Sequence, residues 1–428
     1  MRELCMAVVH LDRRTAEVIT PEQDLVRESV GGAALNLALI GRYGTSAMVF
    51  GAGPLTGTFA PASALLVASF APGVAAESAS AAAIRHVPLL LTAGPDFRCS
   101  GFDHLVLLGA AEEPTLIHID GGLVRFLEPP KQAPDLSTLG RGLRRSSPPF
   151  RSAVLTSPAA DAGIPFASVS IGLKGSLDKA GLTGSMATKN LKGILFGGSG
   201  GIGFANQDLC RSLEIAGKIR PLRKRAGGFD AVLKAIGGGN ERKALSGVKI
   251  QEAACFHCPA PCMVHARFNA VDPRPLRDPK KQAGVLLMDH AGWVSLARKR
   301  RATALPLLSE SIRLGLDPCV AALFLSPAGG IETLASDFAF LQELAKGVGP
   351  SPAASASAAA ADLTFGGSPL LSGADEEARP QTALAFVLGI CPIFLQRFPS
   401  VSGDLPAFLP DVPPASLDRA LKSVLVQR

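Results

Sequence analysis

The sequence has few aromatic and few charged residues. Aromatic side chains make up 5% of the 428 residues, with one Trp and one Tyr, and charged side chains make up 18%. Nucleic-acid binding surfaces combine clustered basic residues with aromatic rings that stack on bases. The basic runs of this chain, RPLRKR, RDPKK and RKRR, are short and far apart. We therefore expect no nucleic-acid partner, and we interpret the net charge of +7 as solvated basic faces or as a surface for an acidic partner protein.

Long hydrophobic runs are also missing. The longest apolar stretches, ASALLVASF and TALAFVLGICPIFL, fall short of the roughly 20 residues that a membrane-spanning helix needs. The first residues, MRELCMAVVHLDRRT, lack the apolar core and the cleavage site of a secretory signal. We expect a cytoplasmic protein without a membrane span. In that compartment, the eight cysteines do not indicate a disulfide framework.

Two regions with different patterns follow one another along the chain. Up to residue 205, short apolar runs such as AMVFGAG, HLVLLGAA, TLIHIDGG and LKGILFGG end in glycine or Asp-Gly, which is typical of strands. Beyond it, FDAVLKAI, ATALPLLSESIRLG and FAFLQELAKG carry apolar residues near the helical period. The sequence predicts an α+β multidomain fold, with a β-rich domain at 1–205 and a mainly helical region at 206–428. A low-complexity loop is expected at 350–380.

A weak internal repeat lies in the helical region, where RLGLDPCVAALFL and VLGICPIFLQRF share a Leu-Gly-aliphatic step and a proline. Gly315 and Gly389 are placed to end a helix in the left-handed conformation. Pro318 and Pro392 suit the first turn of the next helix, and Asp317 suits its N-cap. Each copy then presents free N–H groups that can hold an anion or a polar ring. A plain helix–turn–helix junction is the alternative.

Three cysteines stand close together in CFHCPAPC. Cys255, Cys258 and Cys262 have the spacing C-x2-C-x3-C, which lets three thiolates bind one metal centre from a single loop. The two prolines stiffen that loop. A cubane iron–sulfur cluster or a closed zinc site needs a fourth ligand. The spacing alone favours iron–sulfur, while zinc, with His257 as a ligand or a neighbouring donor, and unliganded thiols stay open.

Five segments in the same order resemble the aldehyde:ferredoxin oxidoreductase family, whose members carry tungsten or molybdenum bound by two pterins. These segments are GGAALNLALI with MVFGAGPLTGTFAPAS, SGFDHLVLLGAAEEPTLIHIDGG, GLTGSMATKNLKGILFGG, ACFHCPAPC and the repeat described above. The resemblance implies that the N-terminal domain forms a floor under the cofactor. It also implies that the two turns of the repeat hold the pterins from the other side.

The resemblance further implies the site residues. Cys391 stands at the place of the family's fourth cluster cysteine, so it would complete a [4Fe–4S] cluster with Cys255, Cys258 and Cys262. The implied cofactor-binding residues are Gly315, Leu316, Asp317, Gly389, Lys189 and Asn190. No catalytic residue is assigned.

The implied activity is the oxidation of an aldehyde, or of a related oxo group, at the pterin-bound tungsten or molybdenum. Electrons would then pass singly through the [4Fe–4S] cluster to a ferredoxin or another electron-transfer protein. Homo- or hetero-oligomeric assembly is compatible with such a role.

Several residues depart from the family pattern. Ile312 and Phe386 stand where the family's two turns carry aspartates that accept hydrogen bonds from the pterins. Losing such an acceptor costs about 1 to 3 kcal/mol per site. Ala33 replaces an arginine of the type that clamps phosphate. The alternative is therefore an electron-transfer or scaffold subunit that keeps the cluster and lacks the catalytic metal.

Overall fold

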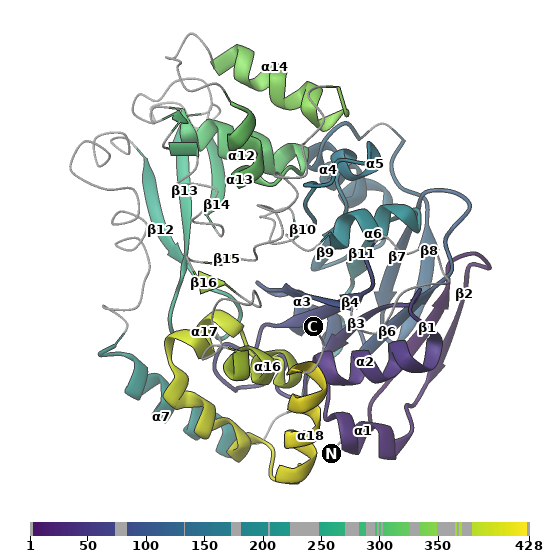
Figure 1. The fold of residues 1–428 in the computed structure, drawn as a ribbon, viewed down its shortest axis with the longest axis vertical. Coiled ribbons are helices and arrows are strands. Elements are labelled where there is room, and N and C mark those ends of the chain that lie inside the picture. Colours follow the sequence, from purple (N-terminus) through teal and green to yellow (C-terminus); the bar gives the residue numbers. More distant parts are fainter. Residues whose placement is uncertain are drawn as a thin grey trace.

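The computed structural model places most of the chain (Figure 1). The described residues are 3–72, 84–131, 133–172, 181–203, 206–222, 248–269, 282–287, 296–297, 299–300, 303–325, 334–348, 364–365, 368–369 and 379–425. The helical prediction for FDAVLKAI and most of the loop predicted at 350–380 lie outside these residues.

The first sheet has six strands in the order β2-β1-β6-β3-β4-β5. Its strands are β1 (Met6–His10), β2 (Thr15–Ile19), β3 (Met48–Ala52), β4 (Leu66–Phe70), β5 (Arg85–Leu89) and β6 (His104–Leu108). β1 and β6 are parallel, and the other neighbours are antiparallel. All residues of β3 and β4 are buried, because helices α2 (Gly32–Tyr43) and α3 (Ala93–Cys99) both pack against these strands.

The second sheet has five strands in the order β10-β9-β11-β7-β8. Its strands are β7 (Thr115–Asp120), β8 (Leu123–Leu127), β9 (Ser152–Leu155), β10 (Ser170–Ile171) and β11 (Leu191–Phe196). Helices α4 (Leu136–Ser146), α5 (Pro158–Asp161) and α6 (Leu182–Thr188) accompany it. α4 begins where the carboxylate of Asp135 accepts a hydrogen bond from the N–H of Thr138 at 2.8 Å, a standard N-cap. The two sheets confirm the β-rich character predicted for this part of the chain.

The C-terminal region is mainly helical. Its helices are α7 (Asn206–Ile219), α12 (Ala304–Leu314), α13 (Pro318–Phe324), α14 (Leu334–Ala345), α16 (Arg379–Leu388), α17 (Pro392–Arg397), α18 (Pro414–Leu425) and the 3-10 turns η4 (Pro399–Gly403) and η5 (Leu405–Phe408). It also contains an antiparallel sheet that the sequence pattern did not predict, formed by β12 (Lys249–Ala253), β13 (Met263–Asn269) and β14 (Gln282–Leu287). A separate short antiparallel pair is formed by β15 (Thr364–Phe365) and β16 (Ser368–Pro369). The fold is α+β, as predicted.

The helical region contacts the N-terminal sheets in two places (Figure 1). α12 packs against α4 and α14 packs against α5, beside the second sheet. α16 and α18 pack against α2, beside the first sheet, and α18 also contacts α1 (Gln23–Ser29). Each of the two repeat turns therefore lies over a different sheet of the N-terminal region. Within the described part of the chain, no helix is both long enough and apolar enough to cross a membrane.

Candidate functional site

The cysteine loop connects β12 to β13 and is held by the N-terminal region. The N–H of Phe256 donates a hydrogen bond to the carbonyl of Leu91 at 2.9 Å, and the N–H of Leu91 donates to the Sγ of Cys255 at 3.4 Å. The carbonyl of the next residue, His257, accepts a hydrogen bond from the N–H of Ala62 at 2.9 Å. The position of the loop is thus set by segments that lie more than 160 residues earlier in the sequence.

Cys391 reaches the same place from the second repeat turn. It is the residue before α17, and Pro392 occupies the first position of that helix. The N–H of Cys391 donates a hydrogen bond to the carbonyl of Ala62 at 2.9 Å. Ala62 therefore binds the cysteine loop through its N–H and the turn of Cys391 through its carbonyl. Its φ of +59° is unfavourable for alanine, so the surrounding contacts hold it there.

The four predicted cluster cysteines lie together, and three of them are buried. Cys255, Cys262 and Cys391 are 7%, 8% and 3% exposed, while Cys258 is half-buried. Burial, followed by the neighbouring thiols, raises the pKa of Cys255 and of Cys391 well above the usual value. Burial also raises the pKa of Cys262, against the charge of Arg397. Without metal these thiols are neutral, and a metal centre would bind them by releasing their protons.

The arrangement differs from a site for one ion. Among the described residues, no three His, Cys, Asp or Glu side chains converge on a position for a single metal ion. A cubane does not require that convergence, because each thiolate binds a different iron. Four thiols, three of them buried, match the ligand set of a [4Fe–4S] cluster.

His257 lies at the outer side of the loop. Its φ is +51°, and its ring lies 5.6 Å from the ring of Phe59 and 6.0 Å from that of Phe256. Burial lowers the pKa of its imidazole, which is therefore neutral at pH 7. The structure places this residue between two aromatic rings.

The two repeat turns have the predicted geometry. α12 ends at Gly315 with φ of +72°, and Gly389 follows α16 with φ of +84°. A Cβ on Gly315 would lie 1.9 Å from the Cβ of Ser157, and a Cβ on Gly389 would lie 2.0 Å from the Oγ1 of Thr56. Glycine is thus required at both turns by conformation and by space.

Each turn is also hydrogen-bonded, in a similar way, to the N-terminal region. The carbonyl of Gly315 accepts a hydrogen bond from the N–H of Ser168 at 2.7 Å, and that of Gly389 accepts one from the N–H of Leu65 at 3.3 Å. Leu316 adds an isolated bridge to Ala167. The repeat seen in the sequence is therefore a repeat of contacts with the N-terminal sheets.

The side chains of the turns do not supply the pterin acceptors that the family resemblance implies. Phe386 is 1% exposed, and its ring lies 6.2 Å from the imidazole of His86. Ile312 packs against an apolar cluster. Asp317 is the N-cap of α13, and its Oδ1 accepts hydrogen bonds from two N–H groups of that helix at 2.8 and 3.1 Å. These residues do not fit the hydrogen-bonding edge of a pterin.

Lys189 and Asn190 follow α6 directly in the chain. Their side chains form hydrogen bonds with the connection between β6 and β7, not with the cysteine segments. The Nζ of Lys189 donates a hydrogen bond to the carbonyl of Gly109 at 3.0 Å, and the Nδ2 of Asn190 donates to that of Ala111 at 2.7 Å. Burial lowers the pKa of Lys189. Both side chains tie β11 to the connection between β6 and β7.

A buried arginine supports the GPLTGT loop and was not singled out by the sequence. The Nη1 of Arg98 donates hydrogen bonds to the carbonyls of Thr56 at 2.5 Å and Pro54 at 3.3 Å. Its Nε lies 3.3 Å from the carboxylate of Asp103, and both side chains are 5% exposed. The pair fixes the loop whose Thr56 contacts the second turn. The residues that it joins lie more than 40 positions apart, so no local motif marks it.

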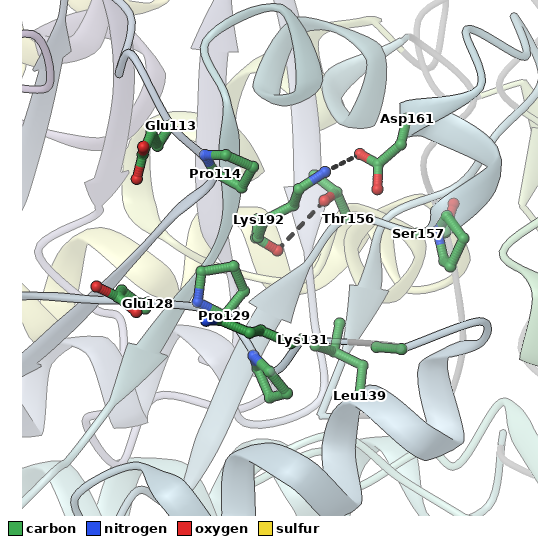
Figure 2. A pocket seen from close by; sticks show the side chains of 13 residues that line it. Glu113, Pro114, Glu128, Pro129, Lys131, Leu139, Thr156, Ser157, Asp161 and Lys192 are labelled. Atoms are coloured by element: carbon green, nitrogen blue, oxygen red, sulfur yellow. Dashed lines mark hydrogen bonds and ion pairs between the residues drawn. The ribbon is translucent and has the colours of Figure 1, made fainter.

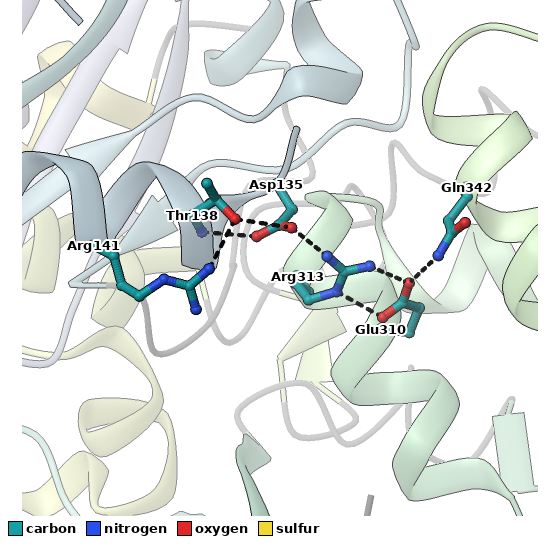
Figure 3. A network of polar contacts seen from close by, with 6 residues as sticks. All are labelled: Asp135, Thr138, Arg141, Glu310, Arg313 and Gln342. Carbon is teal, nitrogen blue, oxygen red and sulfur yellow. Dashed lines mark hydrogen bonds and ion pairs between the residues drawn. The ribbon is translucent and has the colours of Figure 1, made fainter. Parts of the chain in front are cut away.

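A second network of polar contacts, which the sequence did not predict, joins the N-terminal region to the turn of Gly315 (Figure 3). Arg313 forms ion pairs with Asp135, the N-cap of α4, and with Glu310 of α12. Gln342 of α14 donates a hydrogen bond to Glu310 at 3.3 Å. The network connects three helices next to the turn of Gly315.

A cavity of about 360 Å³ lies next to the turn of Gly315 (Figure 2). Its lining residues are Glu113, Pro114, Glu128, Pro129, Pro130, Lys131, Ala133, Leu139, Thr156, Ser157, Pro158, Asp161 and Lys192. Lys192 and Asp161 form an ion pair at its wall. Ser157 belongs both to this lining and to the contact with Gly315, and its Oγ donates a hydrogen bond to the Gly315 carbonyl at 3.2 Å. The cavity contains none of the four cluster thiols.

Comparison with known proteins places the fold. The family profile "Aldehyde ferredoxin oxidoreductase, N-terminal domain" matches residues 6–198. No curated protein matches the sequence. Among solved structures, the "Active site complex BamBC of Benzoyl Coenzyme A reductase in complex with 1,5 Dienoyl-CoA" is similar, with a TM-score of 0.62 and 14% identity over 90% of this chain and 69% of that chain. At that identity, the likeness shows a shared fold.

The N-terminal match and the shared fold define an oxidoreductase of the aldehyde ferredoxin oxidoreductase type. Residues 6–198 belong to the N-terminal domain of that family.

Proposed function

We propose that this chain is a redox protein in which Cys255, Cys258, Cys262 and Cys391 hold one [4Fe–4S] cluster. The observation that carries the proposal is the gathering of four thiols from two distant segments around Ala62. Four cysteines are the ligand set of a cubane. The apolar surroundings of the buried thiols exclude water, which protects a cluster and tunes its potential.

In the full activity that the family implies, the cluster would pass electrons from a pterin-bound tungsten or molybdenum centre, where an aldehyde or a related oxo group is oxidised, to a ferredoxin. Both glycine turns and their backbone contacts with the N-terminal region are present, which supports this activity, whereas the side chains of Ile312 and Phe386 do not fit a pterin. When bound, the metal centre would supply the two-electron chemistry, and the protein would orient it. Assembly with another subunit is compatible with this proposal.

The second candidate is an electron-transfer or scaffold subunit that holds the cluster alone. The apolar side chains of Phe386, which is buried, and of Ile312, which is partly buried, favour it, because neither can accept a hydrogen bond from a pterin ring. Both candidates share the cluster and differ in the catalytic metal.

The test is purification of the full chain without oxygen, followed by measurement of iron, tungsten, molybdenum and zinc per chain. About four irons with about one tungsten or molybdenum support the complete activity. About four irons alone support the electron-transfer subunit. Zinc, or no metal, overturns the cluster assignment.

A further inference from the structure

The cavity next to the turn of Gly315 has the size and the apolar wall of a small-molecule site. Its volume of about 360 Å³ lies in the range of roughly 300 to 1,000 Å³ that is usual for ligand pockets. Such pockets combine a mainly apolar wall with a few polar groups that orient the ligand. The apolar lining residues here are Pro114, Pro129, Pro130, Ala133, Leu139 and Pro158.

The proline part of this wall is already formed and rigid. Pro129 and Pro130 lie just after β8 and are half-buried. Pro130 packs closely on α4, because a Cβ on Gly142 would lie 2.8 Å from its Cγ. Proline has a fixed φ and no backbone N–H, so this segment neither rearranges easily nor leaves a donor unpaired when an apolar group covers it. A ligand therefore pays little for ordering the protein.

Two carboxylates stand at one end of the cavity, as Figure 2 shows. Glu113 lies just before β7, and Glu128 lies just after β8. The two strands pair antiparallel with Leu116 opposite Leu127, so both glutamates lie at the same end of the hairpin. Both side chains are exposed, and neither forms an ion pair with a described residue.

The lysines of the lining leave it with a negative charge. Lys192 forms an ion pair with Asp161, so these two side chains balance each other. The backbone of Lys192 is fixed as well, because the N–H and the Oγ1 of Thr156 donate hydrogen bonds to its carbonyl at 3.0 and 3.3 Å. With Lys131 included, the lining has three carboxylates and two ammonium groups. Its charge is therefore opposite in sign to the net charge of the chain, which is +7.

We propose that this cavity binds a small organic amine, with its ammonium group at Glu113 and Glu128 and its apolar body against the proline wall. An anionic ligand would meet these two carboxylates and would compete with Asp161 for Lys192. A bare metal ion would leave the apolar wall unused. The inference is independent of the proposed cluster, because the cavity contains none of the four thiols.

The test is calorimetric titration of the full chain with three ligands of similar shape. Phenethylamine carries an ammonium group, phenethyl alcohol carries a neutral hydroxyl in its place, and hydrocinnamate carries a carboxylate. Phenethylamine is expected to bind at one site, about tenfold more tightly than the alcohol, and the carboxylate should bind most weakly. Added salt should weaken the binding of the amine and leave that of the alcohol nearly unchanged.

Substitutions locate the site. The double variant Glu113→Gln/Glu128→Gln should lower the affinity for phenethylamine by about tenfold and leave that for the alcohol within about twofold. The matched control is Glu17→Gln/Glu28→Gln, which removes the same charge at exposed positions of β2 and α1 outside the cavity. Ala133→Phe places a ring in the cavity and should abolish the binding of both ligands.

The contrary outcomes are equally definite. Equal affinities for the amine and the alcohol, or an unchanged amine affinity in the glutamate variant, overturn the role of Glu113 and Glu128. Tighter binding of hydrocinnamate would assign the cavity to an acid held by Lys131 and Lys192. Unchanged binding in Ala133→Phe would place the amine elsewhere, and no binding of any ligand removes the site. None of these measurements needs iron, so the amine site and the cluster can fail separately.

Discussion

The N–H of Cys391 donates a hydrogen bond to the carbonyl of Ala62 at 2.9 Å, and the N–H of Ala62 donates one to the carbonyl of His257 at the same distance. One alanine of the N-terminal floor thus joins the fourth cysteine to the loop of the other three. Its left-handed φ of +59° lets the two bonds point to different segments.

Substitution at Ala62 should separate conformation from hydrogen bonding. Ala62→Pro removes the N–H and fixes φ near −65°, so we expect a loss of about 3 kcal/mol or more of unfolding free energy, together with loss of iron. Ala62→Gly keeps both bonds and relieves the left-handed strain, so it should be more stable by about 1 kcal/mol. Urea unfolding and iron analysis test both variants. Normal iron content in Ala62→Pro would contradict the assigned role.

The fourth ligand can be tested with two cysteine variants. Cys391→Ala should lose the cluster absorption as fully as Cys258→Ala does, because each removes one thiolate of the group. The control is Cys319→Ala, whose half-buried thiol lies in α13 over the other sheet. Anaerobic absorption spectra and iron analysis give the result. Loss of iron in Cys319→Ala, with Cys391→Ala unaffected, would assign the fourth ligand to the first turn.

Two buried histidines predict a stability change on acidification. Burial lowers the pKa of His86 and of His104 to about 4 from the ordinary 6.5. Between these values the unfolded chain binds the proton and the folded chain does not, so stability falls as the pH drops from 6.5 to 4. Each histidine contributes up to about 3 kcal/mol over this window, at 1.36 kcal/mol per pKa unit.

The measurement is urea unfolding of the native chain and of His86→Gln between pH 7 and pH 4.5. Gln keeps a polar group near the Oγ of Ser69, which lies 2.8 Å from the Nδ1 of His86, but it does not titrate. We expect a smaller loss on acidification in the variant. Equal pH slopes for the two proteins would show that His86 is not the group that titrates.

The ion pairs of Arg313 should couple the first turn to the floor. Arg313→Met leaves the carboxylates of Asp135 and Glu310, which are 9% and 10% exposed, without their shared cation. We expect a loss of about 1 to 3 kcal/mol of unfolding free energy, moderated because Arg313 itself is 32% exposed. The control is Arg211→Met, which breaks a more exposed pair with Asp208 and should cost under about 0.5 kcal/mol. Similar losses in both variants would remove any special role for the network.

The sequence predicted those parts of the structure that have a local signal. Strands such as β3 and β11 were marked by apolar runs that end in glycine, and the turn at Gly315 was marked by its helix stop signal and the following Asp-Pro. The sheet around the cysteine loop was missed because β12, with the sequence KIQEA, has no apolar run. The Asp135–Arg313 pair joins residues 178 positions apart, so only the folded chain shows it.

The candidate site also has parts with a local sequence signal and parts without one. The four cysteines were predicted from spacing and family resemblance, and the structure brings them together. Their dependence on Ala62 and Leu91 was not predicted, because backbone hydrogen bonds leave no trace in side-chain identity. The motif GPLTGTFAPAS contained Ala62, and only its place in the fold explains why that segment matters.

The hydrogen bonds of Leu91 and Ala62 to the cysteine segments link the two parts of the thiol group to the N-terminal region. The thiols lie together in the folded chain, in which the N-terminal region holds both the cysteine loop and the turn of Cys391. A cluster on these thiols would then join two distant parts of the chain, and its binding energy would stabilise that closed arrangement. In a chain whose N-terminal region is misfolded, the four thiols would not be held together, so the proposed cluster would lack a complete ligand set.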